Sequence, residues 1–265
     1  MSDSQAPKKS LGQHWLNDDV SLEAMSAAAD IQRGDTVLEI GPGTGTLTRV
    51  LLEKGASVVA VELDERLADE LKREFAAADF RLHMTSILAF DLTTLPAGYK
   101  LVANIPYYLT SKLLRTLSDS TNPPSQAAVL IQKEVAQRVT AAAGSTSLLS
   151  VATQFYWHTS LGAEVPAHLF TPPPKVDSQI LILKRRSEPL FSVDEGVFFR
   201  VVKAGFSARR KKLISSLAGG LRCDKSHIKL LLERAGIDAN KRAQMLSLDE
   251  WYALYQVCVA ADMDI

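Results

Sequence analysis

The sequence of 265 residues has little that could cross-link the chain or hold it in a membrane. Its two cysteines, Cys223 and Cys258, are too few for a disulfide framework and lack the paired spacing of metal ligands. No uninterrupted apolar run approaches the roughly 20 residues that a membrane span requires. Residues 1–10 are polar and lack the apolar core of a signal peptide. We therefore expect a cytoplasmic protein without a metal site and without a membrane segment.

The chain also lacks net charge, because 30 Lys and Arg balance 30 Asp and Glu. Positive charge is nevertheless concentrated between residues 184 and 234, where 13 Lys and Arg accompany 5 acidic residues. A local excess of this kind is typical of a surface that contacts phosphate backbones. A solvated basic face without a ligand is the alternative. The candidate phosphate contacts are Lys184, Arg185, Arg186, Arg209, Arg210, Lys211 and Lys212.

Hydrophobic residues make up 46% of the sequence and charged residues 23%, which excludes disordered and collagen-like chains. Between residues 30 and 135, short β-branched runs alternate with helical patterns, which predicts an α/β fold with a buried parallel sheet. After Arg186 the apolar spacing is helical only. We expect an α/β domain over residues 1–186 and a small all-helical domain over residues 187–265. The expected strands cover residues 36–40, 57–62, 80–84, 100–103, 127–131 and 176–184.

A glycine-rich turn, Glu39-Ile40-Gly41-Pro42-Gly43-Thr44-Gly45-Thr46, joins the first expected strand to a helical pattern. Glycines in this position let the backbone approach a nucleotide-like ligand closely. The spacing differs from that of dinucleotide-binding turns, and no Lys-Ser/Thr pair follows as in a P-loop. Glu62 ends the second strand about 20 residues later, where a carboxylate accepts hydrogen bonds from a ribose. These features favour S-adenosylmethionine over NAD, and a turn without a ligand is the alternative.

A second unusual segment, Asn104-Ile105-Pro106-Tyr107, follows the fourth expected strand. Pro106 holds its neighbourhood extended, so that the Asn104 amide oxygen and the Ile105 carbonyl can accept from both hydrogens of one exocyclic amine. Tyr107 would offer a stacking face to the base that carries this amine, such as adenine. Catalysis would depend on orienting the amine toward an electrophilic methyl group, without a histidine base. The alternative is a structural turn with Tyr107 in the core.

Seven stretches together are highly specific: residues 9–16 (KSLGQHWL), 39–48, 61–64, 104–107 (NIPY), 132–135 (QKEV), 170–178 (FTPPPKVDS) and 206–217. On these stretches the chain resembles, over nearly its whole length, the ribosomal RNA adenine dimethyltransferases that act on small-subunit RNA. The resemblance implies a Rossmann-like S-adenosylmethionine domain with a small helical C-terminal domain. It also implies transfer of two methyl groups to N6 of each of two adjacent adenosines, in a hairpin loop near the 3′ end of that RNA.

The resemblance also implies a role for each matching residue. The residues implied to bind the cofactor are Gln13, His14, Leu16, Gly41, Gly43, Glu62, Ser86 and Asn104. The residues implied to hold the target adenine are Asn104, Ile105, Pro106, Tyr107 and Phe170, with Phe170 stacking opposite Tyr107. The family commonly has an acidic residue where this chain has Ser86, so we expect a weaker hydrogen bond to the adenine of the cofactor.

Several alternatives remain open beside this expectation. The related large-subunit enzymes whose methylation confers macrolide resistance are one, although residues 170–177 and the C-terminal helices favour the small-subunit enzyme. A ribosome-assembly or transcription factor that has lost the activity is another, and a nicotinamide oxidoreductase is a third. For the favoured function we expect a monomer whose partner is small-subunit rRNA within an assembling ribosomal subunit.

Overall fold

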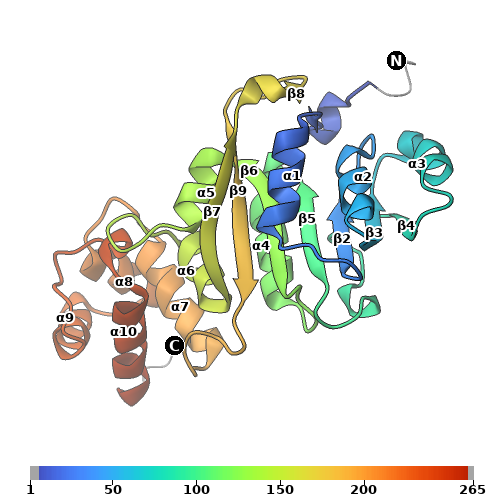
Figure 1. Ribbon diagram of the computed structural model, residues 1–265. Coiled ribbons are helices and arrows are strands. Elements are labelled where there is room, and N and C mark those ends of the chain that lie inside the picture. The colour runs from blue at the N-terminus through green and yellow to red at the C-terminus, as the bar shows by residue number, and fades with distance from the viewer. Residues whose placement is uncertain (1–5, 262–265) are drawn as a thin grey trace. The chain divides into compact units, whose positions relative to one another are not determined.

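The computed structural model describes residues 6–261, and these form two compact units (Figure 1). One unit contains the residues up to 137 together with residues 158–185. The other contains residues 138–157 and the residues from 186 onward. The sequence predicts one boundary after residue 186, whereas the structure groups residues 138–157 with the C-terminal helices.

Seven strands form the sheet of the first unit. Their order is β4 (Phe80–Met84), β3 (Ser57–Glu62), β2 (Thr36–Ile40), β5 (Lys100–Asn104), β6 (Gln126–Gln132), β9 (Ser178–Arg185) and β7 (Trp157–Val165). The strands from β4 to β6 are parallel, and β9 runs antiparallel to β6. The order reverses at β2, because the chain leaves it toward β3 and later returns on its other side with β5. Ligands of parallel α/β sheets bind at the carboxyl ends of the strands beside such a reversal.

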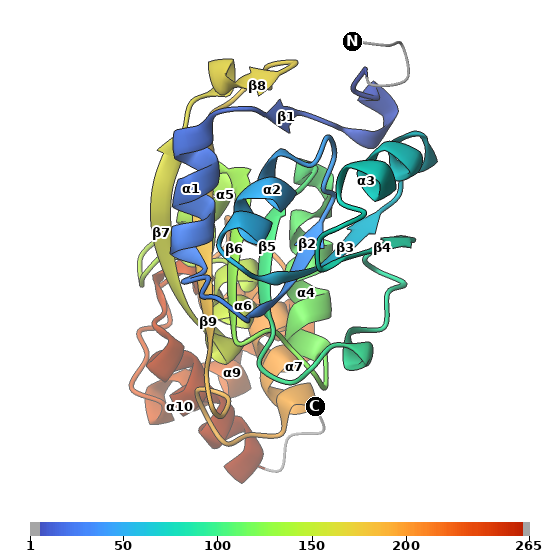
Figure 2. The same ribbon diagram turned by 45° about the vertical axis from the view of Figure 1, so that its right-hand side comes forward.

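Helices cover both faces of the sheet (Figure 2). The helices α1 (Asp19–Ala28), α2 (Thr46–Glu53) and α3 (Ala68–Glu74) lie on one face, and α4 (Thr110–Asp119) and α5 (Lys133–Val139) lie on the other. Right-handed crossovers require α2 and α3 to lie on the face opposite α4, because β2 to β4 and β5 to β6 proceed in opposite directions across the sheet. The buried side chains of Met25, Leu51 and Val58 belong to the core between α1, α2 and the sheet.

A two-stranded sheet joins two segments that are far apart in the sequence. The strand β1 (Trp15–Leu16) pairs antiparallel with β8 (Phe170–Thr171), so that Leu16 lies opposite Phe170. Figure 2 shows these two strands beyond the larger sheet, near the strand ends from which the chain enters α2. Both segments belong to the stretches that carry the family resemblance, and the fold brings them together.

The second unit contains α6 (Leu148–Tyr156), α7 (Glu195–Phe206), α8 (Leu213–Leu221), α9 (Lys225–Arg234) and α10 (Leu248–Ala260). Its core is aromatic: the rings of Phe155 and Phe198 stack with centroids 5.2 Å apart, and Trp251 is fully buried. Gly205 permits close packing of α7, since a Cβ atom there would lie 2.3 Å from the Trp251 ring. Among residues 6–261, no helix is long and apolar enough to cross a membrane.

Candidate active site

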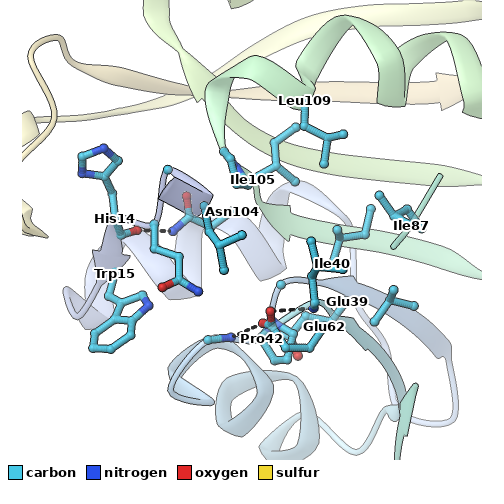
Figure 3. A pocket seen from close by; sticks show the side chains of 18 of the residues that line it. His14, Trp15, Glu39, Ile40, Pro42, Glu62, Ile87, Asn104, Ile105 and Leu109 are labelled. Atoms are coloured by element: carbon cyan, nitrogen blue, oxygen red, sulfur yellow. Dashed lines mark hydrogen bonds between the residues drawn. The ribbon is translucent and has the colours of Figure 1, made fainter. Parts of the chain in front are cut away.

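A cavity lies at the carboxyl ends of β2, β3, β4 and β5, where the strand order reverses (Figure 3). The residues that line it come mainly from five segments, namely 11–16, 39–47, 61–63, 85–88 and 104–109, together with Leu22, Lys112 and Phe170. Each segment leaves the end of a strand or crosses over the ends, so the cavity is built by loops on a rigid sheet. Every residue predicted to bind the cofactor or the target adenine lines this cavity.

The glycine turn forms one wall of the cavity with its backbone. Gly41, Gly43 and Gly45 all have positive φ angles, of 69°, 58° and 78°, which L-residues with side chains rarely adopt. A Cβ atom at Gly43 would lie 3.4 Å from the Trp15 indole, so glycine also keeps this wall thin. The backbone nitrogen of Gly41 donates to the carbonyl of Val61 at 2.9 Å and ties the turn to β3.

Glu62 presents one carboxylate oxygen to the cavity. Its Oε1 accepts from the backbone nitrogens of Leu63 and Asp64 at 2.7 and 2.8 Å. Among the described residues, its Oε2 has only a long contact of 3.4 Å, from the backbone nitrogen of Gly43 (Figure 3). The carboxylate is thus fixed through one oxygen while the other retains acceptor capacity, which is what recognition of a ribose diol requires.

Glu39 is a buried carboxyl group beneath the glycine turn. Its side chain is 1% exposed, its Oε2 accepts from the Thr48 hydroxyl at 2.7 Å, and its Oε1 is buried without a hydrogen-bond partner among the described residues. Burial raises the pKa of Glu39 to about 8, opposed by the Thr48 hydrogen bond and assisted by the charge of Glu62. Sequence motifs assign no separate role to Glu39, although it is the first residue of the glycine-rich stretch.

Asn104 is oriented by the crossing N-terminal segment. Its Nδ2 donates to the backbone carbonyl of His14 at 3.1 Å, which leaves its Oδ1 as the remaining acceptor (Figure 3). Ile105 is buried, and Pro106 has extended backbone angles of φ −55° and ψ 133°, as the sequence predicts. Amide orientation therefore depends on a contact between residues that are 90 positions apart.

Tyr107 is half-buried at the same end of the cavity. Its hydroxyl is 2.8 Å from the Ser178 Oγ, and its ring stacks on His14 with centroids 6.1 Å apart. Burial raises the pKa of Tyr107, so the phenol stays neutral. The Nδ1 of His14 lies 2.6 Å from the carbonyl of Pro172, and since a carbonyl only accepts, this nitrogen donates. His14 thus connects the N-terminal segment with the loop after β8.

Phe170 lines the cavity but is 4% exposed and packs in the apolar core with Leu16, its partner in the β1–β8 pair. Ser86 also lines the cavity, and its Oγ accepts from the backbone nitrogen of Leu88 at 3.3 Å. Residues that the sequence motifs did not indicate complete the walls. They include Leu22, Ile87, Leu88, Leu109 and Lys112.

The N-terminal segment is fastened to the sheet by Asp64. The buried Asp64 carboxylate accepts from Lys8 Nζ at 3.0 Å, from Gln13 Nε2 at 3.2 Å and from Arg66 Nη2 at 2.7 Å. The guanidinium of Arg66, with Lys8 and Gln13, holds the pKa of Asp64 well below its usual range against the effect of burial. The Gln13 Oε1 accepts from the backbone nitrogen of Lys8 at 2.7 Å. Gln13, predicted to contact the cofactor, therefore has both amide atoms engaged within the protein.

The predicted phosphate contacts are divided between the two units. Lys184 and Arg185 lie on β9, and Arg209, Arg210, Lys211 and Lys212 lie in the exposed turn between α7 and α8. Arg186 is half-buried, and its Nε donates to the carbonyl of Gln154 at 3.1 Å. Lys212 donates to Asn240 at 2.7 Å. Among residues 6–261, no group of three or more His, Cys, Asp or Glu side chains is arranged to hold a metal ion.

Comparison with known proteins decides the family. A sequence model described as "Ribosomal RNA adenine dimethylase" matches residues 4–258. This chain belongs to that family. Ribosomal RNA small subunit methyltransferase A of Dehalococcoides mccartyi (strain CBDB1) is 42% identical to it over 252 residues, which cover 93% of this chain and 87% of that relative.

Two solved structures resemble this member of the dimethylase family along most of its length. The 23S rRNA methyltransferase ErmE has a TM-score of 0.75 and 26% identity, covering 92% of this chain and 98% of its own. A dimethyladenosine transferase from Plasmodium falciparum has a TM-score of 0.82 and 24% identity, covering 94% and 99%. The predicted Rossmann-like sheet of a methyltransferase is thereby confirmed, as is the predicted enzyme class, an rRNA adenine dimethyltransferase.

Proposed function

We propose that this dimethylase transfers methyl groups from S-adenosylmethionine to N6 of two adjacent adenosines in the 3′-terminal hairpin loop of small-subunit rRNA. We propose further that it acts as a monomer in the cytoplasm, during ribosome biogenesis. The observation that carries this proposal is the Asn104 amide, whose nitrogen is engaged by the His14 carbonyl and whose oxygen remains an acceptor in the cavity.

The residues around the cavity suit S-adenosylmethionine. The Glu62 Oε2 retains capacity for a ribose hydroxyl, and the positive-φ glycines Gly41 and Gly43 expose backbone to the amino-acid part. Gln13, His14 and Leu16 line the cavity from the N-terminal segment, and Ser86 lines it from the loop after β4. When bound, the cofactor supplies an electrophilic methyl group on a sulfonium. Glu39, with its unpartnered buried Oε1, adds a polar group to the floor of the cavity.

The chain's own contribution to the chemistry is placement. The Asn104 Oδ1 and the Ile105 carbonyl accept the two hydrogens of the adenine amine, which favours a pyramidal nitrogen with an available lone pair. Pro106 holds the two acceptors in an extended turn, and Tyr107 stacks on the base. Phe170, which lines the cavity and is 4% exposed, stacks on the base opposite Tyr107. The amine loses its proton to water after each transfer, so no histidine base is needed.

The RNA assignment is supported by the names of the relatives. The relative at 42% identity is named a small-subunit methyltransferase, whereas ErmE, named a 23S rRNA methyltransferase, shares 26%. An unpaired loop suits the reaction, because a loop adenosine leaves its stack at lower cost than a paired one. Lys184, Arg185, Arg186 and the residues from Arg209 to Lys212 are the proposed phosphate contacts that offset this cost.

The decisive experiment is methylation of small ribosomal subunits that lack the modification. We expect labelled methyl groups from S-adenosylmethionine to appear as N6,N6-dimethyladenosine at two adjacent positions of the 3′-terminal hairpin loop. Asn104→Ala removes the side-chain acceptor and should reduce transfer by about 100-fold or more, on the order of one missing transition-state hydrogen-bonding group. Circular dichroism should show the variant folded. Label in large-subunit RNA alone, or full activity of Asn104→Ala, would contradict the proposal.

A further inference from the structure

One aromatic ring of this protein is left in water. The sequence has 18 Phe, Trp and Tyr residues, all of which lie within residues 6–261. Tyr108 is the single exposed residue among them, with 63% of its surface accessible, and it lines the active-site cavity. Isolated exposed apolar side chains are common on protein surfaces, but this one lies directly after the Asn104–Tyr107 segment at the cavity wall.

The Tyr108 ring has a firm support behind it. A Cβ atom at Gly12 would lie 3.3 Å from Tyr108 Cε1 and 3.4 Å from Pro106 Cβ, so the ring rests against the N-terminal segment where that segment has no side chain. Figure 3 shows the flanking residues Ile105 and Leu109 on the same connection at the cavity. A ring that is supported on one side and exposed elsewhere can serve as a stacking platform.

An unpaired cation accompanies the ring. Lys112 lies four residues further, in the first turn of α4, and it is the single Lys or Arg among the described residues that line the cavity. Lys112 is exposed and forms no ion pair within residues 6–261, whereas Lys8 pairs with Asp64 and Arg115 pairs with Asp119. Tyr108 lies in the short 3-10 helix Tyr107–Leu109 that leads directly into α4, so the two residues line the same stretch of the cavity wall.

We propose that Tyr108 and Lys112 form a subsite for the nucleotide next to the adenosine that is being methylated. The neighbouring base stacks on Tyr108, and the phosphate that joins the two nucleotides contacts Lys112. An adenosine that leaves its stack deprives its neighbour of a stacking partner, and an exposed aromatic ring beside the catalytic turn replaces that partner. This inference rests on the proposed function, because it requires an unpaired adenosine of RNA in the cavity.

The test measures binding of a fluorescent RNA hairpin with two adjacent loop adenosines, at low salt. Tyr108→Ala should weaken binding between about 5- and 150-fold, the equivalent of about 1–3 kcal/mol for one stacked base. Tyr108→Phe keeps the ring and should stay within about threefold of the parent. Affinity for S-adenosylmethionine, measured by calorimetry, should be the same for all three proteins. Unchanged RNA binding by Tyr108→Ala, or an equal loss of binding in Tyr108→Phe, would contradict the stacking of a base on Tyr108.

Hairpins with one base removed identify the stacked neighbour. Abasic sites are placed in turn on the 5′ and the 3′ side of the target adenosine. On one side, removing the base should weaken RNA binding by the parent protein. The same removal should cause little further loss of binding in Tyr108→Ala, because both changes delete the same contact. Fully additive losses at both sides would refute the stacking. A parallel loss of cofactor affinity in Tyr108→Ala would also refute it, since the ring would then support the cofactor wall.

Lys112 has a matched control on its own helix. Lys112→Met should lower the slope of log affinity against log salt by about 0.7–0.9, the value for one phosphate contact. Arg115→Met removes the same charge from an exposed position outside the cavity and should leave the slope unchanged. Equal slopes for both variants would contradict the phosphate contact. Methylation of small subunits by the parent enzyme tests the proposed function separately. Failure of the Tyr108–Lys112 subsite can therefore be distinguished from failure of the proposed function.

Discussion

Glu39 is a carboxyl group that the fold keeps from water and from cations. It is 1% exposed, and its single hydrogen bond among the described residues comes from a neutral donor, the Thr48 hydroxyl. The ionised form is therefore destabilised, which is why the pKa of Glu39 rises to about 8. The protonated carboxyl retains the Thr48 contact without a buried charge.

This environment predicts a pH-dependent cost to stability. In the unfolded chain Glu39 ionises near its ordinary pKa, about 4.3, while in the folded protein it holds its proton to about 8. The folded state thus binds more protons between these values, and stability falls as the pH rises through this window. Glu39→Gln is neutral throughout and should escape this loss.

We expect the melting temperature of Glu39→Gln relative to the parent to rise between about pH 5 and pH 8, the window set by the raised pKa of Glu39. The corresponding change in unfolding free energy is a few kcal/mol at most, since one unit of pKa difference amounts to about 1.4 kcal/mol. Asp91→Asn, at an exposed carboxylate whose pKa is lowered by Thr93, is the control and should show no such rise. A difference for Glu39→Gln that is constant with pH would contradict the buried neutral carboxyl.

At the scale of elements, the strands of the parallel sheet could be predicted from the sequence because most of them are buried on both faces. The expected strands at residues 36–40, 57–62 and 80–84 have the bounds observed, and those at 100–103, 127–131 and 176–184 differ by one or two residues. The edge strand β7 was missed. Of its nine residues only Trp157 and Val165, at its ends, are buried, so no alternation marks it.

Other elements lack a local signal for equally physical reasons. The buried face of α1 includes Ser21 and Ser26 beside Leu22 and Met25, which weakens its apolar period. The two-residue strands β1 and β8 exist through pairing between segments far apart in the chain. In the candidate active site, the residues that the motifs predict to bind the cofactor or the target adenine all line one cavity. The motifs did not predict that Asp64 fastens the N-terminal segment, since that depends on contacts between residues 51 and 56 positions apart.

The fastening of the N-terminal segment is open to test through Asp64→Asn. The low pKa of Asp64 means that its charge stabilises the folded state above the ordinary value of about 3.9, and that this contribution is lost as the pH falls below it. We expect Asp64→Asn to lose about 1–3 kcal/mol of unfolding free energy at pH 7, as for hydrogen bonds to a charged group. The loss should shrink toward about pH 3, below the ordinary pKa of an aspartate.

Cofactor affinity provides a second measurement on the same variant. Because Asp64 holds Gln13, and His14 and Leu16 follow on the same segment, Asp64→Asn should also weaken binding of S-adenosylmethionine in calorimetry. The control is Asp69→Asn, an exposed carboxylate on α3 outside the cavity, which should change neither quantity. Parent-like stability and cofactor binding in Asp64→Asn would exclude the fastening role.

The close approach of α7 and α8 can be tested with two neighbouring glycines. A Cβ atom at Gly220 would lie 2.6 Å from the Cα of Ala204, whereas one at Gly219 would meet nothing within 4 Å. Gly219→Ala should therefore stabilise α8 by up to about 1 kcal/mol through helix propensity. Gly220→Ala should destabilise the protein by about 1–3 kcal/mol, because the backbones must separate. Urea denaturation measures both, and equal effects would show that the helices do not meet there.

At the scale of the whole molecule, neutrality conceals an uneven distribution of charge. The segment of residues 184–234 has 13 basic and 5 acidic residues, while the remaining chain has an acidic excess. The exposed turn between α7 and α8 concentrates four of these cations, from Arg209 to Lys212. Long-range attraction of RNA depends on such local density and not on the total, because screening at physiological salt limits each charge to about 8 Å.

This distribution predicts that RNA affinity and cofactor affinity can be separated. Changing Arg209, Arg210 and Lys211 together to Ala should weaken binding to small-subunit rRNA and lower its salt slope by about 0.7–0.9 for each phosphate that is no longer neutralised. Affinity for S-adenosylmethionine should stay at the parental value, since these residues do not line the cavity. A matched triple change of Lys72, Arg73 and Arg81 removes the same charge from exposed positions of the sheet unit. If both triple variants bind RNA equally weakly, net charge and not the α7–α8 turn governs the encounter.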